Sequence, residues 1–210
     1  MQEAPDAPTD PRPDGRTLRS LRTREAIVDA TISLLEDGDL RPTAPRVAER
    51  AGVSVRSVFQ HFDDLERLHA AVAERLVERV AVLVLPIPPD LPLDERLDRF
   101  VDQRSQLLEA VTAIRRAADV HGPFSREITA RLRDGQAFLR QEVACAFAPE
   151  LGAAPKAERS DVLDALDAVL SWSTWEGLRA GLGREQDHAR SILRRLAAAV
   201  LEAATATTSP

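Results

Sequence analysis

The segment that most constrains the fold is TAPRVAERAGVSVRSVFQHF, residues 43–62. Its residue types predict a short helix, a tight turn and a second short helix. Thr43 is placed to cap the first helix through its hydroxyl, and Pro45 loses no hydrogen bond in the first turn, because N–H groups there have no helical partner. Gly52 ends that helix, since glycine tolerates the positive φ of a helix C-terminus. Two helices therefore follow each other with only a tight turn between them.

The second helix is expected to begin after Ser54, a favoured N-cap residue. Val58 and Phe62 lie four positions apart and are predicted to face inward together. The residues left on the exposed side are Val55, Arg56, Ser57 and Gln60. A short exposed helix that offers Arg, Ser and Gln after a glycine-containing turn is typical of a helix-turn-helix, whose second helix enters the major groove of DNA.

The run T…VAERAGVS…VFQHF…L resembles the N-terminal signature of the tetracycline-repressor (TetR) family of bacterial transcription regulators, over roughly residues 23–68. Members of that family are all-helical homodimers with an N-terminal DNA-binding domain and a C-terminal domain that binds a small molecule and dimerises. The resemblance implies the same organisation here. Beyond residue 68 only chain length and helical character agree with the family.

Two positions depart from the family pattern. Phe59 stands where the family usually has Tyr, and Leu65 stands where it usually has Lys. In the family, that Tyr and that Lys commonly contact DNA phosphates. Phe59 keeps the aromatic ring without the hydroxyl, and Leu65 removes a charge. The loss of one phosphate contact is expected to reduce the salt dependence of DNA binding.

Composition favours an all-α protein. Hydrophobic residues make up 44% of the chain and charged residues 30%, which is ordinary for a soluble globular protein, and aromatic residues are only 4%. Ala, Leu and Arg, which are abundant, are strong helix formers. A single cysteine, Cys145, excludes an intramolecular disulfide and fits a reducing compartment. No stretch approaches the ~20 apolar residues of a membrane span, so we expect a cytoplasmic protein.

Charge is segregated along the chain, whose net value is −6. Residues 1–15 carry −3, residues 16–62 carry +2, and the remainder carries −5. The positive field therefore coincides with the predicted DNA-binding region, and an acidic remainder discourages non-specific DNA contact elsewhere.

Residues 1–15 contain four prolines and almost no bulky apolar side chain, which predicts a disordered tail. A basic stretch follows, with Arg16, Arg19, Arg22 and Arg24. It has two equal interpretations: an arm that touches phosphates or an adjacent minor groove, or the solvated start of a helix. The first full helix is predicted over residues 23–36, closed by the Asp-Gly-Asp of residues 37–39.

The rest of the chain is expected to be a helical bundle. A helix with the apolar stripe Leu65, Leu68, Val72, Leu76 and Val80 is predicted over about 64–84, followed by a proline-rich linker at 85–92. Further helices are predicted over about 94–118, with an interruption near Thr112, over 125 to a point before Pro149, over 157–180 and over 185–203. A break is expected at 121–123, a loop at 152–155 and a turn at Gly181 and Gly183.

Candidate DNA-contacting residues follow from the helix-turn-helix geometry. Arg56 and Gln60 are best placed to read base edges, while Thr43, Ser57 and His61 are candidates for phosphates. The full predicted set is Arg22, Arg24, Thr43, Val55, Arg56, Ser57, Phe59, Gln60 and His61.

Candidate ligand-pocket residues are the unusual side chains of the predicted bundle: Gln103, Arg104, Leu107, His121, Phe124, Phe138, Cys145, Trp172 and Trp175. A pocket between helices is mostly apolar with a few orienting polar groups, which this set offers. The structural alternative for each is core packing, a helix end or a dimer interface. The scattered histidines and lone cysteine show no metal-ligand spacing, and no cofactor is expected.

These observations predict a disordered tail at 1–15, a helix-turn-helix DNA-binding domain at 16–68 and a helical effector-binding and dimerisation domain at 69–210. The expected function is a homodimeric repressor released from a palindromic operator by an unknown small molecule. Catalytic motifs are missing, so no enzyme is expected. The alternatives are an all-helical enzyme or carrier whose N-terminal region only packs, a structural role for the AGVS turn, and a regulator whose ligand is another protein.

Overall fold

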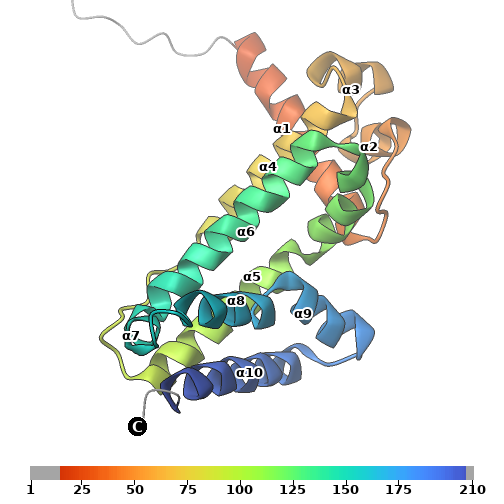
Figure 1. The fold of residues 1–210 in the computed structure, drawn as a ribbon. Coiled ribbons are helices and arrows are strands. Elements are labelled where there is room, and N and C mark those ends of the chain that lie inside the picture. Colours follow the sequence, from red (N-terminus) through yellow and green to blue (C-terminus); the bar gives the residue numbers. More distant parts are fainter. Residues whose placement is uncertain (1–14, 207–210) are drawn as a thin grey trace, which may run out of the picture. The chain divides into compact units, whose positions relative to one another are not determined.

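The computed structural model describes residues 15–206, and within that range every regular element is helical (Figure 1). The predicted all-α class is confirmed. The chain divides into two compact units, an N-terminal unit, Met1–Leu68, and a C-terminal unit, His69–Pro210. The tail predicted at residues 1–15 lies, except for Gly15, outside the described residues.

The N-terminal unit contains α1 (Gly15–Glu36), α2 (Ala44–Ala51), α3 (Val55–His61) and the first turn of α4 (Leu65–Ala81). Helix α1 packs against α2 and α3, and α2 packs against α3. The side chains that hold them together are at most 3% exposed: Ile27, Ile32, Val47, Ala48, Val58, Phe62 and Leu68. Small Ala48 allows α2 to approach its neighbours closely, as expected from its size.

Helix α1 is longer than the predicted 23–36, because it begins at Gly15. The stretch with Arg16, Arg19 and Arg22 is therefore the exposed start of a helix and not an extended arm. After Gly15 this stretch contains neither glycine nor proline, and Leu and Arg both favour helix. The helix ends as predicted, with Gly38 in the left-handed region at φ 89°.

The turn between α2 and α3 has the predicted chemistry with one exception. Gly52 adopts φ 68° and its N–H donates to Ala48 O and Glu49 O, which ends α2. The Ser54 hydroxyl accepts a hydrogen bond from Ser57 N at 3.1 Å and caps α3. Thr43 occupies the N-cap position of α2, but its side chain makes no capping hydrogen bond, contrary to the prediction.

The C-terminal unit is a bundle in which α10 lies along α5 and α8, and α6 packs against α5 and α8 (Figure 1). Its elements after α4 are α5 (Leu93–His121), η1 (Gly122–Phe124), α6 (Arg126–Ala146), α7 (Ala148–Ala153), α8 (Arg159–Val169), α9 (Trp172–Glu176), the π-helix η2 (Gly177–Gly181) and α10 (Gln186–Ala206). The proline-rich stretch at 85–92 contains no helix, as predicted.

Several predicted boundaries in this unit were wrong. Helix α4 ends at Ala81, and Leu65 is 45% exposed and so does not belong to its buried stripe. Helix α5 continues through Thr112, whose hydroxyl donates to Leu108 O instead of competing for the helix. Part of the expected loop at 152–155 belongs to α7.

The single helix expected over 157–180 is divided at Ser171. The Ser171 hydroxyl accepts a hydrogen bond from Thr174 N and caps a new helix, α9. A serine inside an apolar periodicity offers this local hydrogen bond, and the hydrophobic pattern alone does not reveal it. The chain then turns at Gly183, which has φ 61°.

A buried ion pair ties together the start of α5 and the region of α7. The Arg96 side chain is 3% exposed and pairs with Glu150, and it also donates to Ala146 O at 2.7 Å and to Leu91 O at 2.9 Å. One guanidinium therefore binds acceptors in three places at once: the linker, the end of α6, and α7. Within residues 15–206, no helix combines the length and apolar character that crossing a membrane requires.

Candidate nucleic-acid interface

The exposed surface of α3 carries two parallel rows of side chains. A helix turns about 100° per residue, so residues four apart form a row along one side. Arg56 and Gln60, both exposed, form a polar row; Val55 and Phe59, which are 39% and 53% exposed, form an apolar row beside it. Val58 points the other way and is 2% exposed. The helix is thus anchored on one side and open on the other.

Arg56 is exposed, and among the residues that the structure describes none forms an ion pair or a hydrogen bond with its guanidinium. Its five N–H donors are free to meet an external acceptor. Ser57 and His61 lie on the opposite edge of α3 and are half-buried. The structure therefore places the predicted base-reading pair, Arg56 and Gln60, at the centre of the open face.

The arginines of α1 fall into two groups. Arg22, like Arg16 and Arg19, is exposed, and its guanidinium has no partner within residues 15–206. Arg24 differs, because its guanidinium lies 4.9 Å from the centroid of the Phe62 ring. That cation–π contact ties α1 to the end of α3, so Arg24 has a structural role that its sequence position did not reveal.

Two arginines of α2 serve the fold. Arg46 pairs with Asp39 at 2.6 Å, and Arg50 pairs with Asp37 at 2.7 Å and also donates to Ser33. Both bonds fasten α2 to the end of α1 and the loop after it. Thr43, at the start of α2, is exposed. Which arginines are paired depends on contacts across elements, for which the sequence carries no periodic signal.

The two positions that depart from the family pattern are both open to solvent. Phe59 is 53% exposed and Leu65 is 45% exposed. Neither side chain can hydrogen-bond a phosphate.

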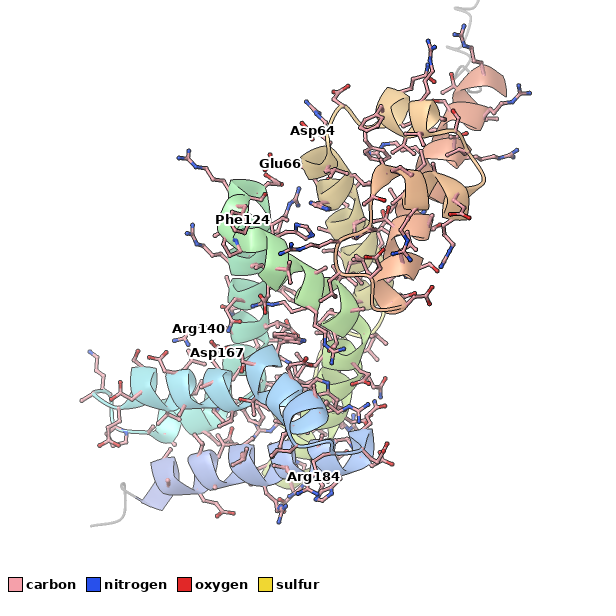
Figure 2. All side chains as sticks on the ribbon, turned by 90° about the vertical axis from the view of Figure 1, so that its right-hand side faces the viewer. Asp64, Glu66, Phe124, Arg140, Asp167 and Arg184 are labelled. Atoms are coloured by element: carbon pink, nitrogen blue, oxygen red, sulfur yellow. The ribbon has the colours of Figure 1, made fainter. Side chains whose placement is uncertain are left out.

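Several of the predicted pocket residues lie at the surface or are engaged in other contacts. Phe124, labelled in Figure 2, is 86% exposed. Phe138 is 49% exposed, and Cys145 is also exposed. Gln103 is engaged elsewhere, because its side-chain oxygen accepts a hydrogen bond from Leu85 N at 2.8 Å. The ring of His121 lies 5.1 Å from that of His69, between centroids.

The tryptophans are held by hydrogen bonds to α5. Trp175 is fully buried and its indole N–H donates to Glu109 at 2.9 Å, while Trp172 donates to the Thr112 hydroxyl at 3.1 Å. Both residues therefore serve the packing of α9 on α5. Glu109 also accepts a hydrogen bond from Arg179. This bond, together with the bond from Trp175, lowers the pKa of Glu109, although burial acts in the opposite direction.

Arg104 and Leu107 are buried in the C-terminal unit. The Arg104 guanidinium is 4.9 Å from the Phe100 ring centroid and donates one hydrogen bond, to Leu139 O at 2.9 Å. No carboxylate in the described part of the chain lies within ion-pair distance of it. Burial lowers the pKa of Arg104 to about 10, and the nearby charges of Asp167 and Glu142 only partly offset this.

Asp167 is committed elsewhere. It accepts a hydrogen bond from Gln136 at 2.8 Å and lies 3.6 Å from Arg140, so that it joins α8 to α6 (Figure 2). A hollow of about 510 Å³ lies instead at η1 and the start of α6. It includes Phe124 but none of the other predicted pocket residues; its lining is Gly122, Pro123, Phe124, Ser125, Arg126, Thr129 and Arg133. Residues 15–206 contain no cluster of three or more potential metal ligands.

A short helix that is anchored by Val58, capped by Ser54 and open along Arg56 and Gln60 defines the chain as a helix-turn-helix DNA-binding protein. Residues 27–72 match the family described as bacterial regulatory proteins, tetR family. Over these residues the chain therefore carries the DNA-binding region of the TetR family of transcriptional regulators. The predicted recognition is thereby confirmed.

Solved structures share the fold at low sequence identity. A tetR-family transcriptional regulator from Streptomyces coelicolor superposes with a TM-score of 0.70 at 17% identity, over 90% of this chain and 84% of that one. A transcriptional regulator from Rhodococcus sp. Rha1 gives 0.66 at 17% identity, over 89% and 97%. The multidrug binding protein EbrR, solved with imidazole, gives 0.56 at 18% identity, over 82% and 93%. No curated protein matches the sequence significantly.

Proposed function

We propose that this regulator is a homodimeric repressor that binds a palindromic DNA operator and is released from it by a small molecule. The observation that carries the DNA-binding part is the unpartnered Arg56 on the open face of α3. An arginine in that position makes the bidentate contact with guanine O6 and N7 that is the commonest specific contact in the major groove.

The remaining N-terminal contacts are assigned to the DNA backbone. Arg22 and the exposed start of α1 approach phosphates, as do Thr43, Ser57 and His61 at the ends and edge of the two helices. Arg24 contributes charge while it remains stacked on Phe62. Each phosphate contact adds about one unit to the slope of log affinity against log salt.

Dimerisation is assigned to α8 and α10, which lie side by side in the C-terminal unit. Leu196 of α10 is 39% exposed, and such an apolar side chain on paired helices favours association with a symmetry mate. Two copies place two α3 helices on one duplex, which is why the operator is expected to be an inverted repeat.

Effector binding is assigned to the C-terminal unit, and Arg104 supports it. A buried guanidinium with one carbonyl partner and no paired carboxylate is costly to a fold and has donors left for a ligand. Leu107 is buried on the same helix and adds an apolar neighbour. EbrR, which has this fold, is described as a multidrug binding protein. Effector and operator are then expected to weaken each other's binding reciprocally.

The test is selection of binding sites from genomic DNA by the purified protein, repeated with Arg56→Ala. We expect the wild type to enrich an inverted repeat, and the variant to bind it about 5- to 150-fold more weakly, since a bidentate base contact is worth about 1–3 kcal/mol. The matched control is Arg184→Ala, an exposed arginine of the C-terminal unit (Figure 2), which should bind like the wild type. Enrichment of the same sequence at equal affinity by Arg56→Ala contradicts the assignment.

A further inference from the structure

The apolar row on α3 is unexplained by the contacts assigned so far. Val55 is 39% exposed and Phe59 is 53% exposed, and they follow one another along the helix at a spacing of about 6 Å. They lie directly beside Arg56, which contacts a base edge in the proposed complex, and beside Gln60, the second candidate for reading bases. If the polar row contacts one set of base pairs in the groove, the apolar row contacts the base pairs next to them.

The chemistry of the major groove restricts what such a row can recognise. Of the groups that bases present there, N7, O6, O4, N4 and N6 are all hydrogen-bonding groups, and Val and Phe offer none in return. The C5-methyl group of thymine is the one apolar group in the groove. Desolvation of a polar base edge by an apolar side chain would cost free energy, because the edge would lose water without gaining a partner.

Phosphate is an equally poor match for Phe59. A tyrosine at this position offers a hydroxyl to a phosphate oxygen, whereas the phenylalanine ring has no donor. The anchored side of α3 does not need the ring either, since Val58 and Phe62, at 2% exposure each, already fill it. The buried side of α3 is therefore closed without the exposed part of the Phe59 ring.

We propose that Val55 and Phe59 read thymine methyl groups, so that each operator half-site has thymine next to the base pairs contacted by Arg56 and Gln60. This inference rests on the proposed DNA-binding function and adds the base preference to it. A phenylalanine in place of the family's usual tyrosine then exchanges a backbone contact for a base contact at this position, and specificity increases there.

The test uses the full-length protein and the inverted repeat recovered by selection. Each thymine of a half-site is replaced in turn by deoxyuridine, which removes only the methyl group and keeps base pairing. We expect one or two thymines per half-site at which wild-type affinity falls about fourfold, from the loss of one buried methyl group. Thymines at other positions of the same duplex serve as internal controls and should tolerate the replacement.

The same duplexes are then measured with Val55→Ala and Phe59→Ala. Both side chains are exposed, so the variants should fold, which circular dichroism verifies. In each variant the penalty for one deoxyuridine position is expected to vanish, and unmodified operator should bind with the affinity that the wild type has for the deoxyuridine duplex. Uniform tolerance of deoxyuridine by the wild type overturns the inference, and so does a penalty that persists unchanged in both variants, because the methyl group then acts through DNA shape.

Failure of this inference is distinct from failure of the proposed function. If the wild type enriches an inverted repeat that Arg56→Ala loses, yet deoxyuridine has no effect, DNA-binding stands and the methyl readout is refuted. If no sequence is enriched, the proposed function and this inference are both refuted. A uniform loss of affinity in Phe59→Ala for all sequences, with deoxyuridine tolerated, assigns the ring to the sugar-phosphate backbone and also refutes the methyl readout.

Discussion

The open surface of the N-terminal unit and the C-terminal unit use arginine differently. On the open surface of the N-terminal unit, Arg16, Arg19, Arg22 and Arg56 are exposed and, within the part of the chain that the structure describes, have no carboxylate partner. In the C-terminal unit, arginines join one element to another: Arg96 to Glu150, Arg116 to Glu176, Arg140 to Asp164, Arg179 to Glu109, Arg190 to Asp102 and Arg194 to Asp98. The N-terminal unit thus leaves four arginines open to solvent, whereas these six arginines of the C-terminal unit hold its elements together.

The difference follows from where the acidic residues lie. Residues 16–62 carry a net charge of +2, so some arginines there are left over, and each unpaired one can displace a counterion from DNA. The remainder after residue 62 carries −5, and several of its arginines pair with carboxylates of another element. Exposed pairs contribute little to stability, whereas removing one partner of a buried pair leaves an uncompensated charge and is strongly destabilising.

The largest effect is expected from breaking the buried pair in the C-terminal unit. Glu150→Ala leaves the Arg96 charge, 3% exposed, without its carboxylate, and should lower the free energy of unfolding by about 3–5 kcal/mol. Urea denaturation followed by circular dichroism measures this. Arg56→Ala, by comparison, should change stability by less than about 0.5 kcal/mol, because it removes no internal contact. Equal losses of unfolding free energy in the two variants would contradict the proposed difference between the two units.

A smaller effect of opposite sign is expected at Arg104. This guanidinium is buried without a paired carboxylate, so Arg104→Met exchanges a desolvated charge for an apolar side chain of similar length and should raise the free energy of unfolding by about 1 kcal/mol. The matched control is Arg96→Met, which removes a satisfied guanidinium and should destabilise instead. Thermal or urea denaturation of both distinguishes them. A marked loss of stability in Arg104→Met would mean that the fold, and not a ligand, requires this charge.

The smallest effect concerns pH. The Arg179 hydrogen bond, the main cause, holds the pKa of Glu109 below its ordinary value of 4.5, so the carboxylate contributes stability above pH 4.5 that is lost as pH falls through the folded pKa. Since Glu109 is 37% exposed, solvent reduces the contribution to about 0.5 kcal/mol. Glu109→Gln should therefore be less stable than wild type at pH 7 and lose less on acidification. Parallel stability profiles between pH 3 and pH 7 would contradict this.

The helix-turn-helix could be predicted almost residue by residue because its signals are local. The Ser54 cap, the positive φ of Gly52 and the burial of Val58 and Phe62 all depend on neighbours within a few positions. The pocket candidates could not be predicted in this way. Phe124 and Phe138 were chosen as unusual side chains, and whether such residues meet depends on how distant helices cross, which their own sequence context does not encode.

The sequence by itself determined the helical class, the DNA-binding motif and which side of α3 stays open, since apolar periodicity and capping act within one or two helical turns. Only the tertiary structure decided that Arg24 stacks on Phe62, that Arg46 and Arg50 are bound while Arg56 is free, and that Arg104 is buried without a carboxylate. The physical reason is range: an arginine side chain reaches partners that lie far away in the chain, and its role is set by the charges that folding brings to it.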